Sequence, residues 1–547
     1  EPTEDENMLV FDSYLTAVNE ELEEKLDFTN HETAGLTIYT NYDPNAQQLL
    51  YNVANTEDYV SFPNDEIQTA MTLMDSTTGK VTALIGGRKY TDRLSINRSV
   101  EMRRDVGSTI KPLTVYGPAI EFLNYSTYQQ IDDEPYDLWD VNNYDRRFRG
   151  QISMREALVD SRNIPAAKFF NENEHLGNRH AEIEQFLDSL GVNVDGISQD
   201  GTLVPQNAIN ATMTPLELTG AYAAFANEGN FTEPHTVVKV VDRNGQETDL
   251  TPRTNKVMED YTAYMVTDIL KGVIPHYGTQ LAIPGYIQAA KTGTTNYSQE
   301  DIARYNIPSG GVPDNWVVGY SPYYTMSVWV GYDKQFEEGK YLNSADGSLR
   351  LSRDIYRETM SSLVENLDQR DWQRPDSVVS VSIEDGSDPA MLAPSGSRNA
   401  VSELFVRGTQ PTQTAEPEYE LTAPTGLRAR YNAELDEVEV SWNAFEWPED
   451  VDDLEVEYVV TVNGQETVQS ETEFTISTPP RELLTISVAV RVDDETGPAA
   501  EVTILVQEQE EPEEPEPEVP EEPEEPEETE DPGAGPPADD GDEGEND

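Results

Sequence analysis

The stretch Gly107-Ser-Thr-Ile-Lys-Pro112 constrains the fold of this chain more than any other, because proline is tolerated only in the first turn of a helix. Pro112 therefore predicts that a helix begins close to Ser108. Residues three apart share one helix face, so the Ser108 hydroxyl and the Lys111 amine are expected to converge. The unpaired N–H groups and the positive dipole end of this helix would lie near the hydroxyl. The stretch thus predicts a nucleophile beside a base, where an oxyanion would be stabilised.

Two further short motifs follow in chain order. They are Ser161-Arg162-Asn163 and Lys291-Thr292-Gly293-Thr294. Pro165 restricts the residue before it, which places the first of them on a loop between helices. Alone, Ser-x-x-Lys commonly marks a solvated helix face, Ser-x-Asn a turn or cap, and Lys-Thr-Gly the end of a strand. The three together, in this order, favour a site for nucleophilic catalysis by serine.

The charge and the missing residue types exclude several other classes of function. The formal net charge is -69, from 105 acidic and 36 basic residues, which argues against a nucleic-acid partner and indicates adaptation to a saline or alkaline medium. The absence of cysteine removes disulfides, thiolate nucleophiles and Cys-ligated zinc. The five histidines show no metal-ligand spacing, so we expect neither a metal nor another cofactor.

No apolar run approaches the length of about 18 residues that a membrane-spanning helix needs. The chain starts Glu-Pro-Thr-Glu-Asp-Glu, which is no signal peptide, and it lacks an initiating Met. We therefore interpret it as the downstream part of a longer polypeptide whose targeting segment is not included.

Hydrophobic periodicity predicts an α+β core in the first two thirds of the chain. Helices are expected at about 8–27, 152–160, 214–229 and 257–272, and strands at 35–40, 287–291, 316–320 and 325–330. Residues 68–87 predict a hairpin of the core sheet, with a turn at Ser76-Thr-Thr-Gly79. We expect residues 1–65 to form an N-terminal helix and linker region and residues 66–365 to form the main domain.

The remainder of the chain changes character twice. Residues 366–420 lose periodicity and gain Ser, Pro and Gly, which predicts a linker. Residues 421–507 alternate polar and apolar positions between turns, which predicts an all-β sandwich with Trp442 in its core, similar to a fibronectin type III module. Residues 508–547 are a Pro/Glu repeat with an acidic end, for which we expect disorder because little apolar surface can be buried.

With these motifs identified, residues from about 30 to 365 resemble the transpeptidase domain of a class A penicillin-binding protein of Gram-positive type. Ser-x-x-Lys, Ser-x-Asn and Lys-Thr-Gly are the signature of penicillin-binding proteins and serine β-lactamases. The likeness extends to Tyr116–Glu121, Met154–Leu158, Thr214–Leu218, Ala224–Gly229 and Asp314–Pro322. It implies an antiparallel sheet covered by helices. The middle motif, Ser-Arg-Asn, departs from the Ser-Asp-Asn form of β-lactamases.

The resemblance implies a role for each residue of the first two motifs. Ser108 would attack the penultimate D-Ala of a peptidoglycan stem peptide, release the terminal D-Ala and form an acyl-enzyme. Lys111 would remove the proton of Ser108, which requires its pKa to fall from about 10.4 toward neutrality through burial and the neighbouring Lys291. Ser161 would relay a proton to the leaving amine, and Asn163 would bind the substrate amide.

The third motif would recognise the end of the substrate. Lys291, Thr292 and Thr294 would meet the terminal carboxylate of D-Ala-D-Ala, and Gly293 would let the strand pass close to the peptide. The backbone N–H groups of Ser108 and Thr294 would form the oxyanion hole. β-Lactams mimic D-Ala-D-Ala and would act as covalent inhibitors on Ser108.

The resemblance also implies a location and partners. Such a protein would work outside the plasma membrane, on the cell-wall side, with cell-wall or divisome proteins as possible partners. The upstream glycosyltransferase domain and membrane anchor of the family are not in this sequence, so contact with the membrane would come only through a missing anchor. The sandwich and the acidic tail offer no catalytic constellation; spacing, wall contact and partner binding remain open for them.

Two alternatives to a D,D-transpeptidase remain open from the sequence. The first is a hydrolase that uses the same acyl-enzyme, either a D,D-carboxypeptidase or a β-lactam hydrolase, in which water resolves the intermediate in place of an amine. The second is a non-catalytic cell-wall scaffold that keeps the fold without the activity.

Overall fold

The computed structural model describes residues 9–26, 35–90, 95–137, 139–194, 197, 202–416, 420–447, 454–493 and 495–507. The chain divides into two compact units, a larger one that extends to residue 418 and a smaller one formed by most of the residues after it. Within the described ranges, no helix combines the length and the apolar character that crossing a membrane requires. The acidic stretch 508–547, predicted to be disordered, lies outside the described residues.

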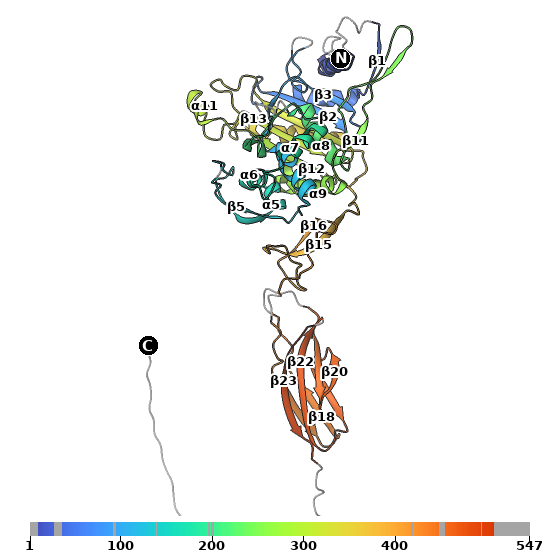
Figure 1. Ribbon diagram of the computed structural model, residues 1–547, viewed down its shortest axis with the longest axis vertical. Helices are drawn as coiled ribbons and strands as arrows, with labels where there is room; N and C mark the ends of the chain where they lie inside the picture. Colours follow the sequence, from blue (N-terminus) through green and yellow to red (C-terminus); the bar gives the residue numbers. More distant parts are fainter. Residues whose placement is uncertain are drawn as a thin grey trace, which may run out of the picture. The chain divides into compact units, whose positions relative to one another are not determined.

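Five antiparallel strands form the central sheet of the larger unit, in the order β12-β13-β14-β2-β3 (Figure 1). Their bounds are β2 (Gln68–Asp75), β3 (Val81–Ile85), β12 (Ala289–Thr294), β13 (Asp314–Tyr320) and β14 (Tyr324–Gly331). The hairpin predicted at 68–87 is confirmed as β2 and β3, and the strands predicted at 316–320 and 325–330 are confirmed within β13 and β14. β12 lies at the edge of this sheet, since among the described strands it pairs with β13 alone.

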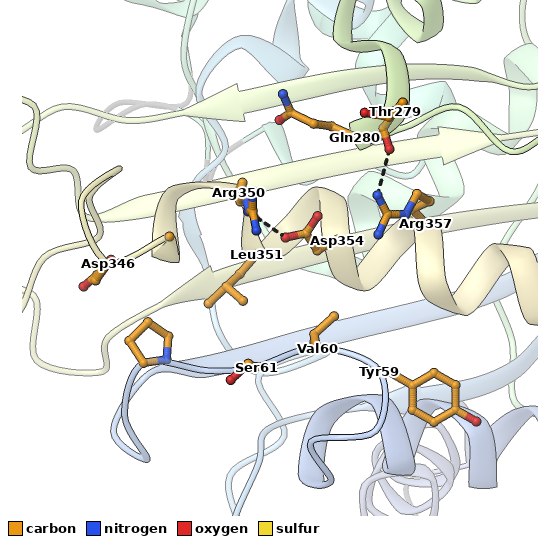
Figure 2. A pocket seen from close by; sticks show the side chains of 12 residues that line it. Tyr59, Val60, Ser61, Thr279, Gln280, Asp346, Arg350, Leu351, Asp354 and Arg357 are labelled. Atoms are coloured by element: carbon orange, nitrogen blue, oxygen red, sulfur yellow. Dashed lines mark hydrogen bonds and ion pairs between the residues drawn. The ribbon is translucent and has the colours of Figure 1, made fainter.

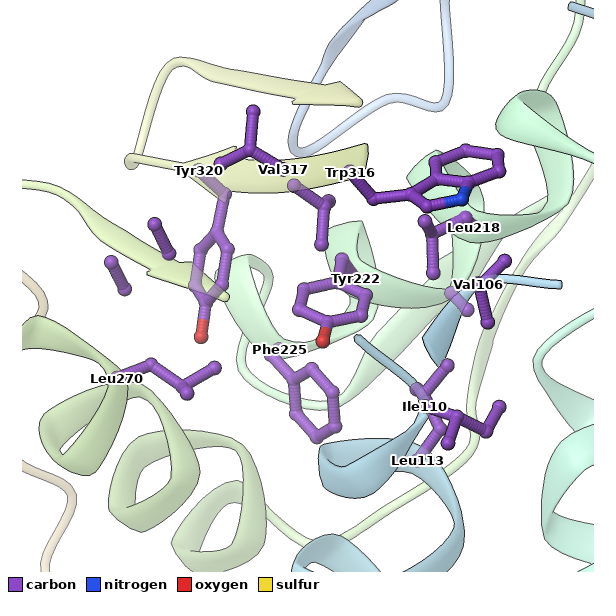
Figure 3. Close-up of a cluster of buried hydrophobic side chains, with 14 of the residues drawn as sticks. Val106, Ile110, Leu113, Leu218, Tyr222, Phe225, Leu270, Trp316, Val317 and Tyr320 are labelled. Carbon is purple, nitrogen blue, oxygen red and sulfur yellow. The ribbon is translucent and has the colours of Figure 1, made fainter. Parts of the chain in front are cut away.

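Helices cover both faces of the central sheet. The helices of the larger unit are α2 (Asp12–Leu26), α3 (Pro44–Asn55), α4 (Gly117–Leu123), α5 (Met154–Val159), α6 (Asn163–Asn171), α7 (His180–Ser189), α8 (Pro215–Ala226), α9 (Asp260–Lys271), α10 (Val273–Tyr277), α11 (Gln299–Arg304) and α12 (Leu351–Val364). The Tyr222 ring of α8 packs on Tyr320 of β13 (Figure 3), whereas a Cβ on the preceding residue, Gly319, would clash with Tyr356 of α12. Because side chains alternate along a strand, α8 and α12 lie on opposite faces.

Short strands surround this core in pairs and triplets. They are β1 (Thr37–Thr40), β4 (Arg104–Asp105), β5 (Gln130–Asp133), β6 (Gly150–Ser153), β7 (Thr212–Met213), β8 (Asn230–Thr232), β9 (Val237–Val241), β10 (Glu247–Asp249) and β11 (Thr254–Lys256). The predicted N-terminal helix is confirmed as α2, and it packs through Tyr14, Val18 and Leu22 against β3 and β9. The Tyr14 hydroxyl donates a hydrogen bond of 2.8 Å to the carbonyl of Val81 in β3. The N-terminal helix is therefore an integral part of the larger unit.

The stretch 366–420 differs from the linker expected there. It contains a regular antiparallel hairpin of β15 (Val378–Glu384) and β16 (Ala400–Val406). The hairpin packs against Tyr128 through Ile383 and Phe405. The abundance of Ser, Pro and Gly around it masked the alternation Val-Ser-Val-Ser-Ile, which is a strand pattern.

The smaller unit is all-β, with two sheets around one hydrophobic core. The strands are β17 (Arg428–Asn432), β18 (Glu437–Ser441), β19 (Glu457–Val462), β20 (Gln465–Gln469), β21 (Glu473–Ser477), β22 (Leu483–Val492) and β23 (Glu495–Leu505). Their orders are β17-β18-β21 in one sheet and β20-β19-β22-β23 in the other. Trp442 is buried in the core between them, as predicted from the sequence.

Candidate active site

The segment that carries Ser108 is helical, and the helix start predicted near Ser108 is confirmed at Gly107. A 3-10 turn spans Gly107–Ile110, a π-helical stretch spans Pro112–Tyr116, and α4 continues from Gly117. Pro112 stands at the first position of the second stretch, which agrees with the tolerance for proline at a helix start. Ser108 is half-buried, and among the described residues its hydroxyl makes no hydrogen bond. The Ser108 hydroxyl is therefore available to a ligand.

Two glycines allow the Ser108 segment to lie directly against β12. A Cβ on Gly293 would lie 2.3 Å from the carbonyl oxygen of Val106, and one on Gly107 would lie 2.6 Å from that of Thr294. Gly107 also has a φ of 54°, a conformation that side chains other than glycine rarely adopt. The sequence placed Lys291–Thr294 at a strand end, whereas in the structure all four residues belong to β12. The first and third motifs therefore meet backbone to backbone.

A buried ion pair holds the approach to Ser108 in place. Arg104 contacts Asp314 of β13 at 2.6 Å, and Asp314 also accepts hydrogen bonds from Thr295 (2.9 Å) and Trp329 (2.8 Å). The indole N–H of Trp316 donates to the carbonyl of Asp105 at 2.9 Å. The residues just before the nucleophile are thus fixed to the sheet that carries the third motif.

The Ser161–Asn163 loop begins with a Schellman motif that ends α5. Ser161 takes the left-handed conformation with a φ of 54°, its N–H donates to Leu158 (3.1 Å), and the N–H of Arg162 donates to Ala157 (2.8 Å). Glycine usually occupies the position of Ser161 in this motif. The strained conformation turns the chain so that Ser161 and Asn163 reach one site, and it is the kind of local strain found at functional sites.

The Arg162 side chain points away from the Ser161 hydroxyl, into a cluster of carboxylates. Its guanidinium is fully buried and contacts the carboxylates of Asp133 (2.8 Å), Asp145 (2.9 Å) and Asp160 (3.3 Å). These three carboxylates compensate the positive charge of Arg162, and their contacts with it stabilise the Ser161–Asn163 loop.

Asn143 is a supporting residue that the sequence gave no reason to select. Its side-chain oxygen accepts hydrogen bonds from the N–H groups of Asn163 (2.9 Å) and Ile164 (3.2 Å), and so it caps the start of α6 from outside the helix. Its amide nitrogen donates to Asp133 (2.6 Å) and to the carbonyl of Arg147 (2.9 Å). Only the tertiary fold brings position 143 beside position 163.

Lys111 is completely buried and reaches the Ser161–Asn163 loop. Its Nζ lies 2.6 Å from the carbonyl oxygen of Ser161, 3.0 Å from that of Arg162 and 2.8 Å from Oδ1 of Asn163. The Ser161 hydroxyl is 3.4 Å away. Burial, and then the positive charges of Lys291 and Arg162, lower the pKa of Lys111 well below its ordinary value. The neutral amine that a general base requires is therefore favoured.

Lys291 approaches the same hydroxyl from β12. Its Nζ lies 2.7 Å from Oγ of Ser161, the side chain is 1% exposed, and burial lowers its pKa to about 7. Two lysines thus converge on one serine hydroxyl, which can accept a proton from one and donate to the other. All three predicted motifs are brought together at this point.

Asn163, which was expected to bind the substrate amide, also contacts Lys111 in the structure. Its Oδ1 contacts Lys111 and its Nδ2 donates to the carbonyl of Asn142 at 2.8 Å. One N–H of the amide remains for a substrate. Asn163 thus also holds the Lys111 amine in position.

Thr292 has a partner from α10. The hydroxyls of Tyr277 and Thr292 are 2.9 Å apart, and the Arg353 guanidinium lies over the Tyr277 ring, 5.1 Å from its centroid. Thr294 is exposed at the end of the same strand. Along the free edge of β12, hydroxyls and backbone groups are available to an extended peptide.

A separate groove of about 470 Å³ lies between residues 59–63, Thr279-Gln280 and the start of α12 (Figure 2). Arg350 and Asp354 form an ion pair along its α12 wall at 3.1 Å, and Arg357 donates to the carbonyl of Thr279. None of the residues of the three motifs lines this groove. It is distinct from the site around Ser108.

Comparison with known proteins shows which family this sequence matches. Residues 69–360 match the family model of the penicillin binding protein transpeptidase domain, and residues 374–418, which include the β15–β16 hairpin, match that of the penicillin-binding protein 1A C-terminal domain. Penicillin-binding protein 1A/1B of Bacillus subtilis is 36% identical over 450 residues, covering 79% of this chain and 47% of that protein. Penicillin-binding protein 1A of Streptococcus pneumoniae is 36% identical over 383 residues, covering 67% and 51%. The chain thus spans about half the length of these relatives.

Solved structures show the same fold at lower identity. The PonA1 protein of Mycobacterium tuberculosis in complex with penicillin V matches with a TM-score of 0.57 at 21% identity, covering 66% of this chain and 96% of that one. The penicillin-binding protein PonA1 structure from the same organism gives 0.56 at 22% identity, covering 66% and 94%. With the family model matching more than half of the sequence, the chain belongs to the penicillin-binding protein transpeptidase family.

Proposed function

We propose that the chain is a D,D-transpeptidase that cross-links peptidoglycan stem peptides through an acyl-enzyme on Ser108. The observation that carries the proposal is the convergence of Lys111 and Lys291 on the Ser161 hydroxyl, beside the segment of Ser108. The names of the relatives, penicillin-binding proteins 1A and 1A/1B, support the same class of activity.

In the first step Ser108 attacks the carbonyl of the penultimate D-Ala, and neutral Lys111 takes the hydroxyl proton. The N–H groups of Ser108 and Thr294 stabilise the oxyanion, each such donor contributing about 3 kcal/mol to the transition state. The C–N bond then breaks, and the leaving amine receives its proton through Ser161. Free D-Ala departs and the acyl-enzyme remains.

In the second step an amine of another stem peptide attacks the ester. Its proton returns along the same path to Ser108, and an amide cross-link forms. Lys291, Thr292 and Thr294 bind the terminal carboxylate of the donor, and Gly293 leaves room for the peptide at the edge of β12. β-Lactams present a similar carboxylate and acylate Ser108 without rapid release.

We place this activity in residues 66–365, on the cell-wall side of the plasma membrane. The sandwich of residues 421–507 is proposed to be a fibronectin type III-like module that acts in spacing, wall contact or partner binding. None of these roles needs a metal or another cofactor.

Labelling with a fluorescent penicillin tests the proposal. The wild-type chain and the control Ser344→Ala, an exposed serine, are expected to carry a persistent label, whereas Ser108→Ala carries none. A stem-peptide donor with a free amine acceptor then shows whether a cross-link forms. Rapid loss of the label or hydrolysis without cross-linking would favour a carboxypeptidase or β-lactam hydrolase, and absence of label on folded wild type would favour a scaffold.

A further inference from the structure

Residues 142–149, Asn-Asn-Tyr-Asp-Arg-Arg-Phe-Arg, form a loop beside the candidate site that we call the Arg loop. The carbonyl of Asn142 accepts a hydrogen bond from the side chain of Asn163, at 2.8 Å. The Tyr144 hydroxyl donates to Asp160, the residue before Ser161, at 3.0 Å. The Arg loop is therefore continuous with the wall of the site formed by Ser161–Asn163.

The backbone of the Arg loop is held in a fixed shape by its own hydrogen bonds. The N–H of Arg146 donates to the carbonyl of Asn143 at 3.0 Å, and the N–H of Arg147 donates to the side chain of Asp145 at 3.0 Å. The carbonyl of Arg147 accepts from Asn143 and from the buried Arg162. Because the loop is ordered before any ligand arrives, binding to it costs little conformational entropy.

The charges of the Arg loop are only partly compensated. Asp145 is engaged by the buried Arg162 at 2.9 Å, and Arg149 is engaged by Asp160 at 2.8 Å. Arg146 and Arg147 are exposed, and within the part of the chain that the structure describes their guanidinium groups form no ion pair. In a chain with 105 acidic and 36 basic residues, two adjacent exposed arginines that pair with no acidic side chain among the described residues are available to bind an anion.

Aromatic side chains accompany these arginines on the surface. Tyr144 is 66% exposed and Phe148 is 45% exposed. Arginine and aromatic residues are the types enriched where proteins bind peptides and other proteins. Guanidinium groups bind carboxylates with two parallel hydrogen bonds. The composition of the surface thus fits an acidic peptide.

We propose that the Arg loop binds carboxylate groups of the donor stem peptide that lie upstream of its D-Ala-D-Ala end; this inference rests on the proposed function. A donor held at the edge of β12 has its D-Ala-D-Ala carboxylate at Lys291 and its acyl carbonyl at Ser108. The rest of the peptide then extends along the wall formed by Ser161–Asn163, where Arg146 and Arg147 meet its acidic groups. The loop thereby selects acidic over amidated stem peptides.

The test compares two D-Ala-D-Ala donors that differ only upstream, one with free carboxylates and one with these groups amidated. For wild type, kcat/KM is expected to be about tenfold higher for the acidic donor, mainly through KM, because two guanidinium–carboxylate contacts are gained. In Arg146→Gln/Arg147→Gln this preference disappears. The control Arg253→Gln/Arg374→Gln removes the same charge at other exposed positions and keeps the preference.

Penicillin labelling and use of any donor test the proposed function, whereas the preference between the two donors tests the role of the Arg loop. Penicillin labelling establishes whether the Ser108 site is assembled in every variant, and failure of wild type to label or to use either donor would overturn the proposed function. A wild type that labels and uses both donors equally would overturn the role of the Arg loop, whatever the variants do. Equal loss of preference in the control pair would also overturn it, since overall charge would then be responsible. Higher salt should weaken the wild-type preference by screening.

Discussion

Replacing Asn143 by alanine tests whether this residue positions the Ser161–Asn163 loop, because the substitution removes hydrogen bonds that hold the loop and leaves the three motifs unchanged. Asn143 is buried and makes four hydrogen bonds, two to the start of α6, one to Asp133 and one to the carbonyl of Arg147. Asn142→Ala is the matched control, because the exposed side chain of Asn142 is removed while its carbonyl, the group that Asn163 uses, is kept.

The expected cost follows from the bonds that are lost. Removing a cap at a helix start costs about 1 kcal/mol, and removing a donor to a buried carboxylate costs about 2 kcal/mol. We therefore expect Asn143→Ala to destabilise the protein by about 3 kcal/mol, seen as a lower urea midpoint, and Asn142→Ala to leave the midpoint nearly unchanged. Because Asn163 and Lys111 depend on this support, misplacement on the order of 1 Å should slow penicillin acylation by about 100-fold.

The assay is the rate of acylation by a fluorescent penicillin, measured well below the urea midpoint of each variant. An Asn143→Ala protein that is destabilised but acylates at the wild-type rate would refute the positioning argument. If Asn143→Ala were as stable as Asn142→Ala, the hydrogen bonds of Asn143 would contribute nothing measurable, and the description of the loop would be wrong.

Three further outcomes are expected. Since burial lowers the pKa of Lys291 to about 7, the free enzyme loses the ammonium that meets the substrate carboxylate as pH rises through about 7, so the second-order rate constant of acylation by penicillin should fall above that pH. The bound carboxylate favours the protonated lysine, so the acylation rate at saturating penicillin should fall only at higher pH, and a flat second-order profile from about pH 6 to 9 would contradict this. Tyr277→Phe, which removes the contact to Thr292, should raise KM about fivefold with little change in kcat, while Tyr286→Phe, away from the site, should change neither. With a net charge of -69, the protein should be more stable at about 1 M than at about 0.1 M salt, as measured by thermal unfolding, because self-repulsion is screened; equal stability at both would be evidence against adaptation to salt.

The sequence predicted the components of the site because each motif has a local physical reason. Pro112 placed a helix start beside Ser108, and the apolar runs of β13 and β14 placed two core strands. The helix start predicted near Ser108 is confirmed at Gly107, but the sequence did not indicate that the segment is a 3-10 turn followed by a π-helical stretch. Residues 366–420 were assigned to a linker because their composition concealed the β15–β16 hairpin.

The sequence alone determined which residues make up the candidate site. They are a serine and a lysine one helical turn apart, a second serine and an asparagine on a loop, and a second lysine near a glycine on a strand. These patterns are local, and a local pattern can be recognised without knowing the fold. Only the tertiary structure decided that both lysines contact one serine hydroxyl and that Asn143 and Tyr277 support the motif residues. Such contacts join positions far apart in the chain, and the pKa of a buried lysine depends on its whole surroundings, which no local pattern records.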